Sequence, residues 1–384
     1  MARLSLLRRT LALAATGAVV AALSFGVVQA ATPVQDLRSA TDAALAAERA
    51  AVDQSITDLN AQVAALQGQV AERDALVVTL LARIAELEAQ LDPCAVHVPA
   101  GTNLAAAVKA APVGAVVCLS GSYITSVPVE PLAGQTIQGP ATVIGTGLDV
   151  FNLKDALGVT LIDLDISGAD RHGVACGVGT TVIGGRLHHN DKDGVGCDLD
   201  GLGPVLVDGV EIDHNGSDAW LGKGAAGIKW FHAHGVTVTN SFVHDNYGNG
   251  VWCDAQCGDF TVTNNIITCN LRKGVFYEKG GESDGSFGGA VYVGFMTVTG
   301  NTIQDNNTER SYQGSAGVSI LASKNALVAD NIFGGNMRAI IVRDDPSRVA
   351  DDKHGWLVSN VTLRNNVLNG DEVVGCALAG VTCS

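Results

Sequence analysis

The spacing of apolar residues changes along the chain and predicts two kinds of element. Between residues 35 and 92, where Gly and Pro are almost absent, apolar residues recur in steps of three and four. From Val159 onward, apolar and polar residues alternate in short segments separated by Gly, Asn and Asp. The first pattern is typical of a long helix, and the second of short strands joined by tight turns.

The helical segment keeps a heptad period. A helix lying on another domain would drift with a period of 3.6 residues, whereas this seam holds 3.5. Ile or Val at one seam position and Leu at the other favours a parallel dimer, with a trimer as the alternative. We therefore expect residues 31–92 to form a coiled-coil stalk that makes the protein a homo-oligomer. The seam consists of Ile56, Leu59, Val63, Leu66, Val70, Val77, Leu80, Ile84, Leu87 and Leu91.

The strand segment, residues 159–384, repeats one unit: V-x-V-x-[NGD]-x-x-[VIL]-x-x-N, a variable turn, then Gly-Val. One such unit is too small to bury its own apolar side, but stacked units bury a continuous core. An Asn at a fixed turn position can pair with the Asn of the next coil. We therefore predict an all-β, right-handed parallel β-helix, a solenoid that follows the N-terminal coiled coil. The Asn residues in register are Asn190, Asn215, Asn246, Asn270, Asn306 and Asn336.

The segment between the two patterns, residues 93–158, reads as an N-terminal cap and the first coils. It contains a short helix at "NLAAAVKAA" and strands at "AVVCLSGSYI" and "QTIQG". Cys94 and Cys118 are placed to staple this cap.

Residues 1–30 have the features of an export signal: Arg3, Arg8 and Arg9, an apolar stretch, and a small-x-small site ending at Ala30. An uncleaved membrane anchor is the alternative. Export permits disulfides, and the odd total of nine Cys leaves at least one thiol unpaired or paired between chains. We expect a secreted or cell-surface protein.

The formal charge of −15 adds one restriction. An acidic surface repels phosphate backbones and anionic lipid, so nucleic acid and membrane surfaces are disfavoured as partners.

Alignment of the segment that follows each Asn turn predicts which side chains face outward. The second position of all seven rows is Val or Ile, so it should face the core. Because side chains alternate along a strand, the fourth position should also face the core, and the third and fifth positions should point out. The rows are "GVACG", "GVGCD", "GIKWF", "GVWCD", "GVFYE", "GVSIL" and "AIIVR". Neighbouring coils lie about 4.8 Å apart, so Asp254 and Glu278 should be stacked neighbours. Beside them we expect Lys229, Trp252 and Phe276, with Asp198 and Arg343 towards the ends of the column.

A second polar cluster precedes these rows. The segments "RLHHND", "EIDHNG" and "FVHDNY" align His188 with Asp213 and His244, and align His189 with His214 and Asp245. His is the natural proton shuttle near neutral pH. We expect both clusters to border one groove, and the sequence leaves open whether the His cluster binds a metal.

From the repeat pattern and the Asn ladder, the chain resembles the pectate-lyase-like superfamily of right-handed parallel β-helix repeat proteins over residues 95–384. The resemblance implies action on a polysaccharide. A glycoside hydrolase would use Asp254 and Glu278 as acid and as nucleophile or base. A lyase would use Lys229 or a His to remove the proton α to a uronate carboxylate, with Arg343 or a carboxylate-bound Ca²⁺ holding that carboxylate.

The residues proposed for catalysis are Asp254, Glu278, Lys229, His244 and Asp245. Those proposed for substrate binding are Trp252, Phe276, Asp198, Arg343, His188 and His214. Simpler interpretations stand beside these. Lys229 and Asp254 could form only a salt bridge, the aromatic rings could only pack, and the whole protein could be a non-catalytic glycan-binding or adhesive module.

Overall fold

The computed structural model describes residues 34–88, 93–221, 224–283, 292–307, 314, 316–345 and 357–384. The chain divides into two compact units, Met1–Asp92 and Pro93–Ser384, and each is described by itself. The expected signal segment, residues 1–30, lies outside the described residues.

The first unit contains one long helix, α2, of 55 residues over Val34–Glu88. Its seam residues from Ile56 to Ile84 are all large, apolar and about half exposed on the single chain. Leu91 and the side chain of Leu87 lie outside the described residues. Within the described ranges, no helix is both long enough and apolar enough to span a bilayer.

The second unit opens with a cap, which covers one end of the apolar core. Helix α3 begins after Asn103, whose side chain accepts a hydrogen bond from the Ala106 backbone N–H and so caps the helix. The Cys94–Cys118 disulfide ties the cap to its second strand. The elements of the cap are β1 (Val96–Pro99), α3 (Leu104–Ala110), β2 (Val116–Thr125) and β3 (Thr136–Gly145).

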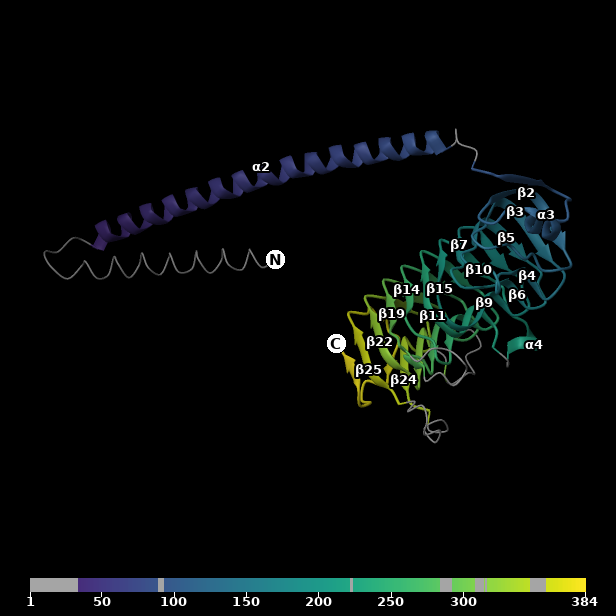
Figure 1. The fold of residues 1–384 in the computed structure, drawn as a ribbon. Coiled ribbons are helices and arrows are strands. Elements are labelled where there is room, and N and C mark those ends of the chain that lie inside the picture. The colour runs from purple at the N-terminus through teal and green to yellow at the C-terminus, as the bar shows by residue number, and fades with distance from the viewer. Residues whose placement is uncertain are drawn as a thin grey trace. The chain divides into compact units, whose positions relative to one another are not determined.

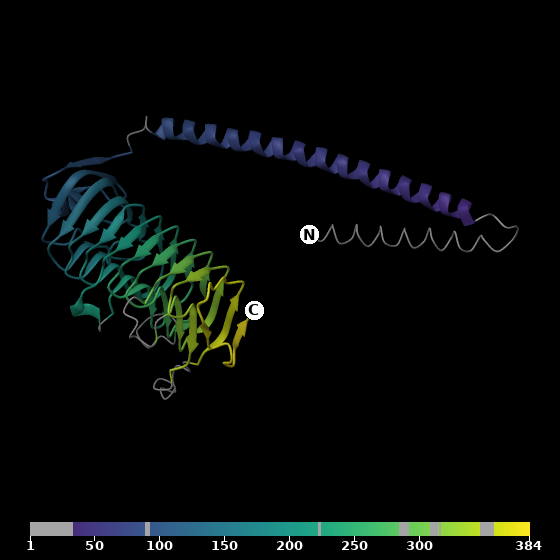
Figure 2. The same ribbon diagram turned by 180° about the vertical axis from the view of Figure 1, so that it is seen from behind.

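Beyond the cap, parallel strands stack into a β-helix with three faces, which Figures 1 and 2 show as successive coils from teal to yellow. We call the faces sheets 1, 2 and 3 in the order in which each coil visits them. Sheet 1 contains the first half of β5 (Thr160–Ser167), β7 (Thr181–Ile183), the ends of β9 (Asp193–Asp208) and β11 (Ala226–Thr239), β14 (Phe260–Thr263), β19 (Met296–Thr299), β22 (Lys324–Ala329), β25 (Ser359–Arg364) and β27 (Val381–Cys383).

Sheet 2 follows a tight turn and consists of the second half of β5, β8 (Arg186–His188), β10 (Glu211–Asp213), β12 (Phe242–His244), β15 (Ile266–Thr268), β20 (Thr302–Gln304) and β23 (Ile332–Gly334). Sheet 3 consists of β4 (Asp149–Asn152), β6 (His172–Ala175), the starts of β9 and β11, β13 (Asn249–Asp254), β16 (Val275–Glu278), β21 (Val318–Leu321), β24 (Ile340–Arg343) and β26 (Val373–Val374). Outside the three faces lie helix α4 (Asp218–Leu221) and the short antiparallel pair β17 (Glu282–Ser283) and β18 (Tyr292–Val293).

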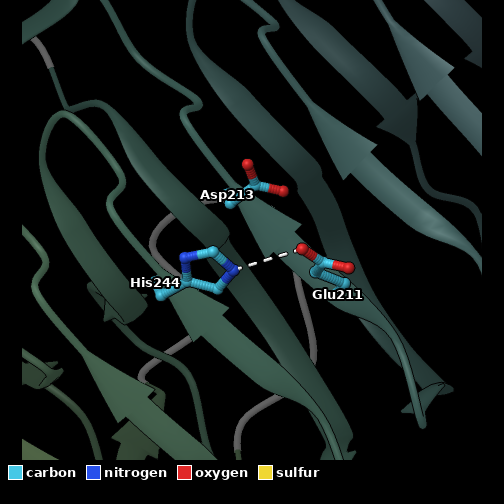
Figure 3. Close-up of side chains that lie close together, drawn as sticks. All are labelled: Glu211, Asp213 and His244. Carbon is cyan, nitrogen blue, oxygen red and sulfur yellow. Dashed lines mark hydrogen bonds and ion pairs between the residues drawn. The ribbon is translucent and has the colours of Figure 1, made fainter.

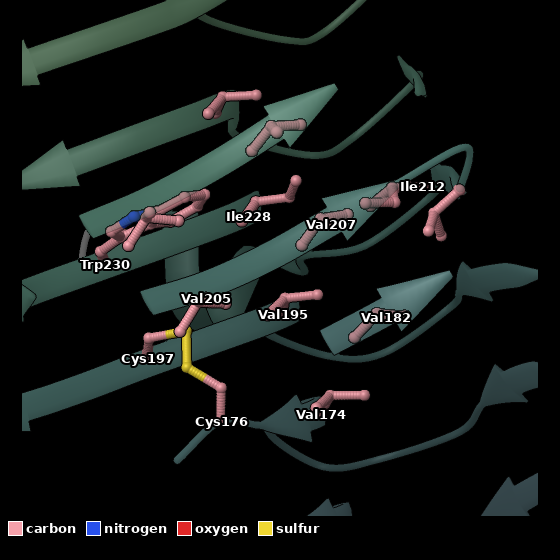
Figure 4. Packing of buried hydrophobic residues seen from close by; sticks show 14 of the residues in the cluster. Val174, Cys176, Val182, Val195, Cys197, Val205, Val207, Ile212, Ile228 and Trp230 are labelled. Atoms are coloured by element: carbon pink, nitrogen blue, oxygen red, sulfur yellow. A yellow bond between two sulfur atoms is a disulfide. The ribbon is translucent and has the colours of Figure 1, made fainter. Parts of the chain in front are cut away.

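The core is built from the Val and Ile of each Gly-Val row. Val174, Val195 and Ile228 are fully buried and stacked, and Trp230 fills the interior beside them (Figure 4). The Cys176–Cys197 disulfide lies inside this core and links neighbouring coils. Because alternate residues of a strand point to opposite faces, this packing fixes which side chains face solvent.

Two ladders of hydrogen-bonded polar side chains stabilise the turns between the sheets. Between sheets 2 and 3, Asn246 donates through Nδ2 to Asn270 Oδ1 at 2.9 Å and accepts from Asn215 Nδ2 at 3.0 Å. The ladder runs from Asn190 to Asn336, as the sequence predicts, and ends on Asp371. A second ladder between sheets 1 and 2 was not predicted; it contains Ser241, Asn265, Asn301, Asn331 and Asn366.

Two further disulfides, Cys253–Cys257 and Cys376–Cys383, close short loops. Cys269 is the one free thiol in the described part of the chain.

Candidate functional site

The register of sheet 3 is the one expected from the sequence. Lys229 pairs with Trp252, Trp252 pairs with Phe276, and Asp254 pairs with Glu278. The backbone of Asp198 pairs with Phe231, but the Asp198 side chain lies outside the described residues. The third and fifth columns of the rows therefore stand side by side on this face.

The aromatic residues of the column are not free platforms for a sugar. The Trp252 ring has Lys229 Nζ 3.9 Å from its centroid, and it stacks on Phe276 with the centroids 5.4 Å apart. Phe276 itself is buried and packs with Leu321 and Ala322. Phe276 is therefore not exposed to a ligand, whereas Trp252 remains partly exposed beside Lys229.

The two carboxylates of the column differ in surroundings. Asp254 is partly exposed, and its Oδ2 lies 2.9 Å from Lys229 Nζ, so the expected salt bridge is present. Glu278 is only 9% exposed. Arg343 lies three coils beyond Asp254 in the same column, so it is too far along the solenoid to act beside it.

A pocket of about 230 Å³ opens on sheet 3 around Lys229 and Asp254. Four cationic side chains line it, against the acidic side chains of Asp193 and Asp254, in a chain whose formal charge is −15. Neither Glu278 nor any of the turn histidines lines it. The lining residues are Lys154, Arg171, His172, Lys192, Asp193, Gly196, Cys197, Lys229, Phe231 and Asp254.

The cations are held by contacts with neighbouring coils. Arg171 donates two hydrogen bonds to Asp149, at 3.1 and 2.9 Å, which fixes its guanidinium. Lys192 Nζ lies 3.5 Å from Asp193 Oδ2 and 5.4 Å from the centre of the Trp220 ring. Such pre-positioned cations suit a ligand that carries a carboxylate or another anionic group.

The floor of the pocket requires a glycine. His172 Nδ1 lies 3.1 Å from Asp193 Oδ2, and the imidazole ring packs over Gly196. A Cβ at Gly196 would lie 2.2 Å from His172 Nδ1, so no larger residue fits without displacing the ring.

Sequence reasoning missed Lys154, Arg171, His172 and Lys192 as site residues. A signal for two of them existed. Arg171 and Lys192 each stand two residues before a Gly-Val row, in "RHGVACG" and "KDGVGCD". Extension of the aligned rows by two positions would have shown the basic column.

A buried lysine lies one coil beyond the pocket. Lys273 is 2% exposed, and its Nζ lies 3.7 Å from the centre of the Phe276 ring. Burial lowers the pKa of Lys273 to about 7; the Glu278 carboxylate opposes this shift, and Arg272 and Arg343 add to it.

This shift predicts a pH-dependent stability. Because the unfolded chain binds a proton at Lys273 up to a pKa of 10.5 and the folded chain only to about 7, raising the pH above 7 favours the folded state. Relative to Lys273→Met, the free energy of unfolding of the wild type should rise by about 1.4 kcal/mol per pH unit between pH 7 and 9. Urea titrations at several pH values measure this difference, and parallel curves for the two proteins would contradict it.

The His cluster lies on sheet 2 and in the turn that follows it. Asp213 is in register with His188 on one side and His244 on the other, as expected. His189 and His214 stack with their ring centroids 5.0 Å apart, and both have a left-handed backbone. The cluster shares no pocket lining with Lys229 and Asp254, so the expectation of one common groove is wrong: the Asn turn separates the two faces.

Hydrogen bonds between oppositely charged side chains hold this second cluster together. Arg186 donates to both oxygens of Asp213, at 2.7 and 2.6 Å. Burial alone would raise the pKa of Asp213, but the hydrogen bonds from Arg186 and His214 outweigh it, and the pKa is lowered. Burial and the neighbouring His188 and His214 lower the pKa of His189.

The pocket on sheet 3 does not fit Ca²⁺, which was one of two alternatives for holding the substrate carboxylate. Ca²⁺ takes six to eight oxygen ligands, whereas this pocket is lined by four cations and two acids.

Stacked parallel coils with three faces and continuous Asn ladders define the protein as a right-handed parallel β-helix. Residues 149–292 match the family described as "Right handed beta helix region", which confirms at the level of fold the resemblance stated above. No curated protein sequence matches the chain.

Solved structures with the same fold include tailspikes and epimerases. The enzymatically active domain of tailspike protein 2 of bacteriophage CBA120 is 13% identical with a TM-score of 0.50, over 73% of this chain and 44% of that one. The A-module of the Azotobacter vinelandii mannuronan C-5 epimerase AlgE6 is 14% identical, with a TM-score of 0.43. The match covers 73% of this chain and 94% of the epimerase module. The Dettilon tailspike is 13% identical, with a TM-score of 0.44. The match covers 70% of this chain and 57% of the tailspike. This chain thus spans little more than half of the Dettilon tailspike, and at these identities the likeness shows the fold alone.

Proposed function

We propose that this protein is an exported β-helix enzyme that binds an acidic polysaccharide along sheet 3 and cleaves it as a lyase. One observation carries the proposal: Lys154, Arg171, Lys192 and Lys229 surround one pocket on an otherwise acidic chain. A neutral glycan gains little from such a pocket, whereas a uronate carboxylate gains charge-assisted hydrogen bonds. The four disulfides of the described residues fit an oxidising compartment.

The lyase step follows from the positions of Lys229 and Asp254. With the uronate carboxylate held by Arg171 and Lys192, the proton on the adjacent carbon becomes acidic, because the charge that develops on its removal is met by fixed cations. Lys229 Nζ, in its neutral amine form, takes that proton, and the Asp254 carboxylate at 2.9 Å stabilises the ammonium that results. The C4–O4 bond then breaks, a C4=C5 double bond forms, and the proton returns from Nζ to O4.

The hydrolase alternative has less support. It needs two carboxylates that face one bound sugar. Glu278 is nearly buried and does not line the pocket. The second carboxylate that lines the pocket, Asp193, is fully buried and paired with His172 and Lys192.

Binding of the acidic polymer is tested first. We expect polygalacturonate or alginate to bind, neutral dextran not to bind, and the affinity to fall as salt screens the cations. Lys192→Gln should weaken binding about tenfold, since it removes one charge-assisted contact. Lys109→Gln, which removes an exposed lysine of the cap, is the matched control and should change nothing. Equal binding of dextran, or no effect of Lys192→Gln, would refute the assigned pocket.

We further propose that α2 joins chains through its seam, as a dimer or trimer. Large apolar residues at a and d favour burial in a coiled coil over exposure to water. Light scattering should give the mass of two or three chains for the wild type and of one chain for Leu66→Asp/Val70→Asp. Ala61→Asp places the same charge off the seam and should keep the oligomer. A monomeric wild type would be the contrary result.

A further inference from the structure

The cluster on sheet 2 gathers four carboxylates around a single arginine. Asp165 lies 2.7 Å from His188, Asp213 is held by Arg186, and Asp245 lies 2.8 Å from His244. Glu211 lies 3.5 Å from Arg186. With neutral imidazoles, four carboxylates face one arginine, a net charge of 4 − 1, or three negative charges. A site of this charge attracts either protons or a divalent cation.

Three members of the cluster converge. One ligand atom each of Glu211, Asp213 and His244 lies within 4.8 Å of the other two. Figure 3 shows Glu211 facing His244, with Asp213 beside them. Glu211 and Asp213 lie on β10, and His244 lies on β12. Strands β10 and β12 are paired in register, so this approach is fixed by the coil stacking. The site therefore rests on two rigid strands rather than on a loop.

The distance between His244 Nε2 and Glu211 Oε1 is 3.4 Å, which is long for a hydrogen bond. Bonds of 2.0–2.2 Å from a tetrahedral metal ion place two of its ligands roughly 3.4 Å apart. The pair is thus already spaced as two ligands of one ion.

Asp213 Oδ1 can accept one further bond, from a metal ion. Its Oδ2 accepts from Arg186 and from His214, whereas its Oδ1 accepts only from Arg186 Nε. A carboxylate oxygen accepts two hydrogen bonds or ligand bonds, so Oδ1 has one lone pair left. Arg186 then acts as the group that orients the ligand, as is common around metal-binding carboxylates.

We infer that Glu211, Asp213 and His244 bind a divalent transition-metal ion of the zinc class. An imidazole with two carboxylates suits Zn²⁺ and its neighbours in the first row, whereas Ca²⁺ requires an all-oxygen set. The ion joins two successive coils and offsets most of the negative charge of the cluster, and it lies on a different face from the polysaccharide pocket.

The test uses the full chain, stripped with a chelator and titrated calorimetrically with Zn²⁺. Cys269→Ser serves as the background, because a free thiol is itself a zinc ligand and Cys269 lies in the neighbouring turn. We expect one Zn²⁺ per chain, weaker binding by at least about tenfold in His244→Gln and in Glu211→Gln, and no competition by Ca²⁺. Co²⁺ should give the intense visible absorption of a four-coordinate site.

His234→Gln is the matched control. His234 is also a half-buried histidine paired with a carboxylate, Asp259, at 3.1 Å, but it lies outside the cluster. Its replacement should leave the zinc affinity unchanged. The inference fails if the wild type binds no stoichiometric Zn²⁺, if His244→Gln binds as tightly as the wild type, or if Ca²⁺ binds equally well. Glu211 is partly exposed, so Glu211→Gln keeps the test valid should His244→Gln not fold.

Discussion

Replacement of Lys229 by methionine should lower kcat on an acidic polysaccharide by about 10²–10⁴-fold, the usual contribution of a positioned proton-transfer group. Methionine keeps most of the side-chain volume and the packing on Trp252 while removing the nitrogen. The affinity for the polymer should fall by much less, because Lys154, Arg171 and Lys192 remain.

A purely structural salt bridge predicts a different result. Both side chains of this pair are mostly buried, so a purely structural role predicts that Lys229→Met lowers the free energy of unfolding and leaves turnover intact. Asp254→Asn separates the two cases further, because it keeps the shape of the side chain but removes the negative charge that stabilises the lysine ammonium. Loss of turnover with retained binding in both variants supports the lyase step, and full turnover in either one refutes it.

Replacement of Asn246 by alanine should destabilise the β-helix by about 3–5 kcal/mol. Asn246 is 1% exposed, and its side chain bonds to Asn215, to Asn270 and to the backbone carbonyls of Ile212 and His244. Each buried group left without a partner costs about 1–3 kcal/mol, and several are left at once.

The loss should be local before it is global. In a solenoid each coil contacts mainly its neighbours, so hydrogen exchange should speed up around Asn215 and Asn270 rather than throughout the chain. Asn152→Ala is the control, since that half-buried Asn makes one side-chain contact of 3.4 Å and lies outside the ladder. Urea unfolding measures both variants. A change below about 1 kcal/mol for Asn246→Ala would contradict the structural role of the ladder.

Much of the fold was predictable because one repeated rule governs it. The Val of each Gly-Val row must enter the core, and that single requirement fixes the faces of Lys229, Asp254 and Glu278. The second ladder was missed, although Asn265, Asn301 and Asn331 recur at one register of the repeat.

The site was predictable only in part. Sequence columns show which residues are neighbours, but they do not show whether a neighbour covers a ring, as Phe276 and Lys229 cover Trp252. Nor do they show on which side of a turn a cluster lies, so His188 and His244 were assigned to the wrong groove. The basic pocket draws Lys154 from the loop after β4, and no repeat position marks that residue.

The measurement that tests the central claim most directly is product formation on a panel of polysaccharides. The wild type should release new reducing ends together with the ultraviolet absorbance of unsaturated uronates, from an acidic polymer and not from dextran. Reducing ends without that absorbance would mean hydrolysis, and neither signal on any acidic polymer would mean that the basic pocket of sheet 3 does not catalyse elimination.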